Sequence, residues 1–151
     1  MAEESLIESQ KIEQYKAYMQ DLSNIGTRHE TARGFYLSVL SALLAFVALA
    51  GTGGPLSNIG PRLFVVISVG AIAICGLWFL HTLSFSALYR AKIGRLHAME
   101  ERLPFQNFTA EFDALKGDWR YIRLTTVECL VAIIFMLLFL VALVLNSCPK
   151  S

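Results

Sequence analysis

Charged residues are scarce in this sequence and are almost absent from three long segments. Only 17% of the 151 residues are Asp, Glu, Lys or Arg, and 55% are hydrophobic, a balance that soluble domains of this size rarely have. The apolar segments lie at 35–51, 63–88 and 124–145. Each approaches or exceeds the roughly 20 residues that a bilayer core requires, and so short a chain has nothing left to bury three core helices. The sequence therefore predicts an all-α integral membrane protein with three transmembrane helices.

Proline is also scarce, and the first one is Pro55. Apolar side chains at Ile12, Tyr15, Met19 and Leu22 follow helical spacing, which predicts an amphipathic helix able to run unbroken into the first span. Thr109 is expected to cap a short helix after the second span. The predicted order is a cytoplasmic amphipathic helix at 1–33, transmembrane helix 1 at 34–52, an external turn at 53–61, transmembrane helix 2 at 62–88, a cytoplasmic helical extension with the short helix at 89–123, transmembrane helix 3 at 124–146 and an external tail at 147–151.

No cleavable signal peptide is visible, because the first ten residues are acidic and polar where a basic and then an apolar region is needed. Eleven of the thirteen Lys and Arg residues lie before the first span or between the second and third. The positive-inside rule then places the N-terminus in the cytoplasm and the C-terminus outside. Of the three cysteines, Cys148 falls on the outer side, where it is either an unpaired surface thiol or a cross-link between protomers.

Motifs of catalysis are missing. The chain has no glycine-rich phosphate loop and no cluster of His, Cys or carboxylates at metal-ligand spacing. We therefore expect no enzyme activity, no catalytic residues, no metal site and no cofactor.

Two ionisable residues stand inside predicted spans. Glu128 lies about one turn into the third span, and His81 lies in the inner part of the second. A carboxylate is costly at this depth unless it is paired or hydrated. Two interpretations stay open: Glu128 pairs with Arg33 or Arg123 at the interface, or Glu128 and His81 line an ion pathway or its gate.

Small residues recur at helical spacing in the first two spans, at Ser38, Ala42 and Ala45 and again at Ser68, Ala71 and Cys75. Helices approach one another closely in lipid along such faces. Packing within one chain and assembly of several copies explain these faces equally well.

Basic residues gather beside the first two spans. His29 and Arg33 continue the apolar stripe of the first helix toward the membrane, with Arg28 beside them. Lys92 and Arg95 follow the second span at a similar height. These five cations are either ordinary membrane anchors or a site for an anion such as a lipid headgroup or a nucleotide phosphate.

The order of these features resembles a family of small bacterial three-span membrane effectors of anti-phage defence, of the Hailong and cyclic-oligonucleotide type. The first matching motif comprises Arg28, His29, Ala32, Phe35 and Leu37, with Arg33 in place of an asparagine. The second comprises Ala91, Lys92, Glu100, Leu103, Pro104, Leu124, Thr125 and Glu128. The resemblance implies a homo-oligomeric ion channel in the bacterial inner membrane. It would be gated by a nucleotide or oligonucleotide messenger from a partner nucleotidyltransferase.

Two functions are therefore predicted. The first is an oligomeric channel that depolarises the cell, with an anion site at the five cations and a pathway or gate at Glu128 and His81. The second is a non-enzymatic structural or accessory subunit of a larger membrane complex, whose amphipathic helix docks a partner. A toxic channel halts growth when expressed alone, whereas an accessory subunit is inert.

Overall fold

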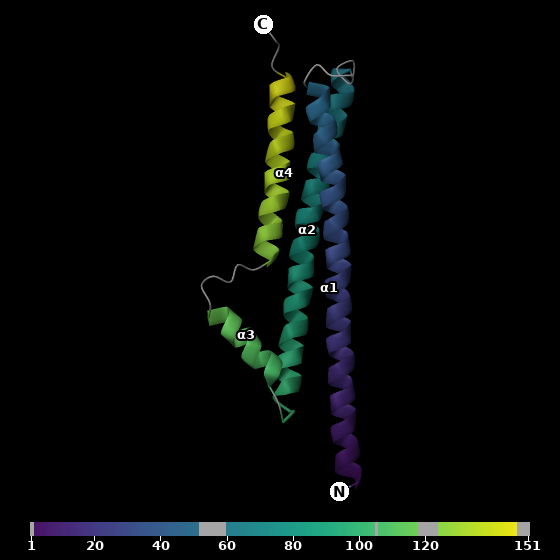
Figure 1. The fold of residues 1–151 in the computed structure, drawn as a ribbon, viewed down its shortest axis with the longest axis vertical. Coiled ribbons are helices and arrows are strands. Elements are labelled where there is room, and N and C mark those ends of the chain that lie inside the picture. Colours follow the sequence, from purple (N-terminus) through teal and green to yellow (C-terminus); the bar gives the residue numbers. More distant parts are fainter. Residues whose placement is uncertain (1, 52–59, 105, 118–123, 148–151) are drawn as a thin grey trace. The chain divides into compact units, whose positions relative to one another are not determined.

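The computed structural model describes residues 2–51, 60–104, 106–117 and 124–147, which form four helices in the order shown in Figure 1. Helix α1 runs Ala2–Gly51, α2 runs Pro61–Glu100, α3 runs Asn107–Gly117 and α4 runs Leu124–Ser147. Within the described ranges no residue is in a strand. Three of the helices, α1, α2 and α4, contain stretches long and apolar enough to cross a membrane. The predicted all-α fold with three spans is confirmed.

The helix ends follow from local chemistry. Helix α1 continues from the amphipathic segment into the first span without a break, as the absence of proline predicts. At the start of α2, the Gly60 carbonyl accepts from the Leu63 and Phe64 amides at 2.9 and 3.4 Å, and Pro61 occupies the first helical position, where its missing N–H costs nothing. Helix α2 ends at Glu100, and a turn then leads to Pro104, which disfavours helical geometry in the residue before it.

The chain divides into two compact units, each of which is described by itself. The extension unit consists of Met1–Glu30 and Ser84–Arg123, and the span unit consists of Thr31–Leu83 and Leu124–Ser151. The predicted external turn lies mostly outside the described residues, and so do Cys148 and Arg123.

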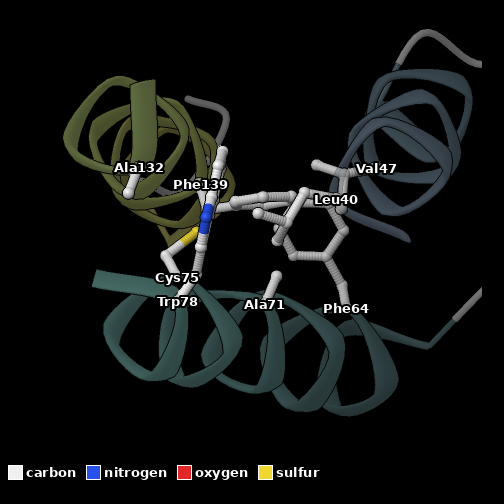
Figure 2. Close-up of a cluster of buried hydrophobic side chains, with 8 residues drawn as sticks. All are labelled: Leu40, Val47, Phe64, Ala71, Cys75, Trp78, Ala132 and Phe139. Atoms are coloured by element: carbon white, nitrogen blue, oxygen red, sulfur yellow. The ribbon is translucent and has the colours of Figure 1, made fainter. Parts of the chain in front are cut away.

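The core of the span unit is formed by α1, α2 and α4. Figure 2 shows side chains of all three helices converging, with the Trp78 and Phe64 rings of α2 directed between the other two helices. Phe139 of α4 and Leu40 of α1 are fully buried there. The eight buried residues of this cluster are Leu40, Val47, Phe64, Ala71, Cys75, Trp78, Ala132 and Phe139.

The extension unit has a smaller core. The stripe predicted from Ile12 to Leu22 is confirmed, because its four members are half-buried or buried while the residues between them are mostly exposed. On α2, Ile93 and Leu96 are buried, followed by the carboxylate residue Glu100 with no exposed surface. This buried charge is the least expected feature of the unit.

Candidate functional site

An ion pair joins α1 to α4 in the span unit. Arg33 Nη1 lies 3.5 Å from Glu128 Oε1, and the two side chains are 33% and 4% exposed. Arg33 is one of the two partners that the sequence offered Glu128; the other, Arg123, lies outside the described residues. A carboxylate excluded from solvent requires such a partner.

His81, the other predicted pathway residue, lies on an exposed part of α2 in the same unit. Its ring centroid is 6.0 Å from that of Tyr36 on α1. The neighbouring Thr82 points inward and is 1% exposed. Among the described residues, the Thr82 hydroxyl and the Trp78 indole N–H have no hydrogen-bond partner. The polar side chains His81 and Thr82 therefore lie on an exposed and on a buried face of α2.

The predicted anion-binding cations have different environments. Lys92 is paired with Asp21 and lies 5.1 Å from the ring centroid of Tyr18, so the extension unit already supplies its counter-charge. His29 is 7% exposed and stacks on Phe85, with the ring centroids 3.7 Å apart and the planes within 4°. Arg28 and Arg95 are exposed on α1 and α2. Arg33 belongs to the span unit.

A buried carboxylate of the extension unit was not among the predicted site residues. Glu100, the last residue of α2, accepts hydrogen bonds through both oxygens from two other helices. Its Oε1 accepts from the Tyr15 hydroxyl of α1 at 2.8 Å and from the Phe108 amide at 3.1 Å. Its Oε2 accepts from the Thr109 amide at 2.8 Å and from the Thr109 hydroxyl at 2.6 Å.

Glu100 thus caps α3 from outside that helix. The first turn of a helix presents amide N–H groups without partners inside the helix, and a negative charge is favoured at that end. The sequence had suggested Thr109 as the cap at the start of α3, and this prediction is wrong. The helix begins at Asn107, and the Gln106 carbonyl accepts from the Ala110 amide at 3.1 Å. The Thr109 hydroxyl instead donates to Glu100.

The same contacts shift two titrations. Burial alone raises the pKa of Glu100, but the hydrogen bonds from Thr109, Tyr15 and the two amides outweigh it and lower the pKa below the ordinary value. Burial raises the pKa of Tyr15 to about 12, and its bond to the Glu100 carboxylate and the charge of that group add to the shift. The extension unit therefore favours an ionised Glu100 beside a neutral Tyr15.

The contacts of these groups connect helices through hydrogen bonds and charge. Among the described residues, no group of three or more His, Cys, Asp or Glu side chains is placed to hold a metal ion. The Glu100 cluster fastens α1, α2 and α3 of the extension unit, and the Arg33–Glu128 pair fastens α1 to α4 in the span unit.

The sequence matches the octameric membrane protein family (8xMP) over residues 12–148. The matched range includes both ionic clusters and all three candidate spans almost entirely. Neither a curated protein nor a solved structure matches the chain. The family match accords with the three apolar helices and describes an oligomeric protein of the membrane. This chain belongs to the octameric membrane protein family.

Proposed function

We propose that the chain assembles as an octamer into an ion channel, and that the Arg33–Glu128 pair holds the channel closed. The observation that carries the proposal is the Glu128 carboxylate, 4% exposed and 3.5 Å from a guanidinium at the end of two spans. Ionisable groups within membrane helices are rare and mark ion pathways or switches.

The energetics of such an ion pair suit a switch between two states better than a contact that only stabilises the fold. A buried ion pair adds little net stability, because desolvation offsets much of the attraction between the charges. Removing one partner, however, leaves an uncompensated charge and is strongly unfavourable. The pair therefore gives the α1–α4 contact two distinct states, according to whether Arg33 is available to Glu128.

An anion is the natural competitor for Arg33. A guanidinium binds phosphate oxygens in the same forked geometry that it uses for a carboxylate. A nucleotide or oligonucleotide phosphate bound at Arg33 would withdraw it from Glu128 and favour the open state, provided that the ligand binds the open state more tightly. Arg28, His29, Lys92 and Arg95 stay predicted ligand contacts on sequence grounds, and Arg28 and Arg95 are the exposed ones.

The resemblance noted in the sequence suggests the biological process in which this channel would act. The protein would be a membrane effector of anti-phage defence that depolarises the bacterial inner membrane, with its messenger made by a partner nucleotidyltransferase. The distribution of Lys and Arg supports a cytoplasmic N-terminus. The chain itself performs no catalytic step in this proposal.

Ion flux through liposomes tests the proposal. Purified wild type is compared with Arg33→Gln, Glu128→Gln and the charge reversal Arg33→Glu with Glu128→Arg. Arg62→Gln, which removes the exposed arginine at the other end of the spans, is the matched control. Each single change at the pair should raise the unliganded flux at least about tenfold, the effect of ~1.4 kcal/mol on a closed–open equilibrium. The reversal should restore the low flux, and the control should leave it unchanged.

Two results separate the parts of the proposal. If neither wild type nor any variant passes ions, with or without nucleotide, the proposal that the chain forms a channel is wrong. If ions pass but the flux of the single variants equals that of Arg62→Gln, the proposal that the Arg33–Glu128 pair is the gate is wrong. In cells, a voltage-sensitive dye should report depolarisation on induced expression, stronger in Glu128→Gln than in wild type.

An accessory role is the second candidate. Leu6 and Ile7, near the start of α1, are 62% and 49% exposed, and apolar side chains so placed suit the docking of a partner helix. An accessory subunit would leave growth and membrane potential unchanged when expressed alone. Leu6→Ser with Ile7→Ser would then abolish recovery of the partner, whereas a channel would keep its conductance.

A further inference from the structure

The two small-residue faces of the sequence have different surroundings in the span unit. Ser68, Ala71 and Cys75 of α2 have no exposed surface and lie in the core between the helices (Figure 2). Their small side chains are therefore used for packing within one chain. Ser38 and Ala45 of α1, which the sequence grouped in the same way, are exposed.

The exposed face of α1 is continuous. Its residues alternate by four and three positions, the spacing that keeps side chains on one side of a helix. A Cβ added at Gly34 would meet no atom of the described residues within 4 Å, so none of these residues approaches the surface there. We define the small face of α1 as the exposed residues Gly34, Ser38, Ser41, Ala42, Ala45 and Ala48.

The outer surface of α4 is of the opposite kind. Eleven of its large hydrophobic residues are exposed, from Leu124 to Leu145. Along 34–50 of α1, the exposed large hydrophobic residues are Phe35 and Leu49, one near each end. Large side chains fill the irregular surface that lipid chains present, whereas small ones allow a second helix backbone to approach. The exposed surfaces of the two helices are therefore of different kinds.

We infer that the small face of α1 is the surface on which a neighbouring copy of this chain packs in the oligomer. A second copy is the occupant because the family is oligomeric and this face is exposed in the described part of the chain. Lipid packs poorly against it, since small side chains leave gaps between acyl chains and lose dispersion contacts. The inference rests on the oligomer and is independent of ion conduction.

Photo-crosslinking of the full chain in its membrane identifies the occupant. A diazirine-bearing amino acid is placed at Ser41 or Ala45, and at Leu137 or Val141 of α4 as controls, because both control positions belong to the exposed large hydrophobic surface of α4. A closed ring joins two different patches of neighbouring copies, so a reagent that reacts with any nearby residue is required. Illumination should give a ladder of covalent multimers from the α1 positions and monomer from the α4 positions.

Substitution gives a second measurement that needs no probe. Ala45→Leu adds bulk to the small face, and Val141→Phe adds similar bulk to α4. Light scattering of protein purified in mild detergent should show that Ala45→Leu lowers the fraction of full-size oligomer at least fivefold. Val141→Phe should leave that fraction as in wild type.

Several outcomes would overturn the inference. A ladder from Leu137 but none from Ser41, or an Ala45→Leu oligomer of full size, would place the interface elsewhere. Adducts with a different protein would show that this protein, and not a second copy, occupies the small face of α1. Reaction of Ser41→Cys with a membrane-impermeant thiol reagent above the wild-type background would show that the face is exposed to water. A wild type that scatters as a monomer would instead show that no oligomer forms, and this would also contradict the proposed channel.

Discussion

Replacing Glu100 by glutamine should release α3 from the extension unit. Each carboxylate oxygen accepts two hydrogen bonds, Oε1 from Tyr15 and Phe108 and Oε2 from Thr109 twice. Whichever way the glutamine amide is turned, its NH₂ group faces one backbone N–H that cannot accept, beside a hydroxyl that can rotate to accept. The bond from that N–H is lost and the other three no longer involve a charge, so the expected cost is about 3 kcal/mol.

Hydrogen exchange followed by mass spectrometry measures this cost locally. Peptides covering 106–114 should exchange about 100-fold faster in Glu100→Gln than in wild type, if the cost appears as easier opening of the unit. Glu101→Gln is the matched control, since the adjacent carboxylate is exposed and accepts no described hydrogen bond. Tyr15→Phe removes one of the four bonds and should fall between the two. Equal exchange in Glu100→Gln and Glu101→Gln would show that the Glu100 carboxylate does not hold α3 in place.

The same cluster predicts that the extension unit loses stability in acid. Because the folded state lowers the pKa of Glu100, the unfolded state takes up the proton first as the pH falls. The stabilisation is present above the ordinary pKa of 4.5 and is lost as the pH falls through the lower folded-state value. In Glu100→Gln this acid-dependent step in exchange should disappear.

Three further predictions concern other contacts. Because the folded state raises the pKa of Tyr15 to about 12 from 10.0, its contribution is full below pH 10 and is lost between pH 10 and 12, which phenolate absorbance during unfolding should report. Asp21→Asn should cost less than about 1 kcal/mol in denaturant unfolding, since that side chain is 54% exposed beside Lys92. Phe139→Ala should cost about 2 kcal/mol of packing in detergent unfolding, whereas Leu138→Ala on the exposed face should cost almost nothing.

The helices could be predicted because their causes are local in sequence. Long apolar runs and the lack of proline before Pro55 suffice for α1 and α2. The stripe from Tyr15 through Leu22 and Gly26 to His29 could also be predicted, since spacing alone determines which side of a helix a residue occupies. His29 was expected to offer its charge to an anion on that stripe. Whether its ring would meet a ligand or Phe85 depends on the other helix, which spacing does not reveal.

The Glu100 cap could not be predicted by the same logic. Helix caps are sought among the residues immediately before a helix, and this favoured Thr109. The carboxylate that caps α3 comes from another helix, and tertiary contact brings it there. One signal was present: Leu96, Glu100 and Leu103 are spaced by four and three, so Glu100 lies within an apolar seam. A charged side chain among buried apolar ones requires hydrogen-bond partners. The first turn of α3 supplies amide N–H groups that have no partner inside their own helix.

The small faces show a different limit. Sequence spacing identifies a helix face suited to close approach but is silent on whether the approaching helix belongs to the same chain. Burial separates the two cases here, because Ser68 and Ala71 are covered while Ser38 and Ala45 are not.

Unequal exposure of the two partners makes the Arg33–Glu128 gate testable beyond simple disruption. The Arg33 side chain is 33% exposed and can reach water when its partner is removed, whereas Glu128 is 4% exposed and cannot. Arg33→Gln should therefore open the channel more than Glu128→Gln, because it takes a positive charge away from a buried carboxylate. Arg33→Gln combined with Glu128→Gln leaves two neutral amides able to hydrogen-bond. If the Glu128 carboxylate drives opening once the Arg33 guanidinium is gone, liposome flux in this double variant should fall below that of Arg33→Gln alone. If instead the attraction between the charges is the latch, the double variant should pass ions as fast as either single one, and the carboxylate would not be the element that opens the gate.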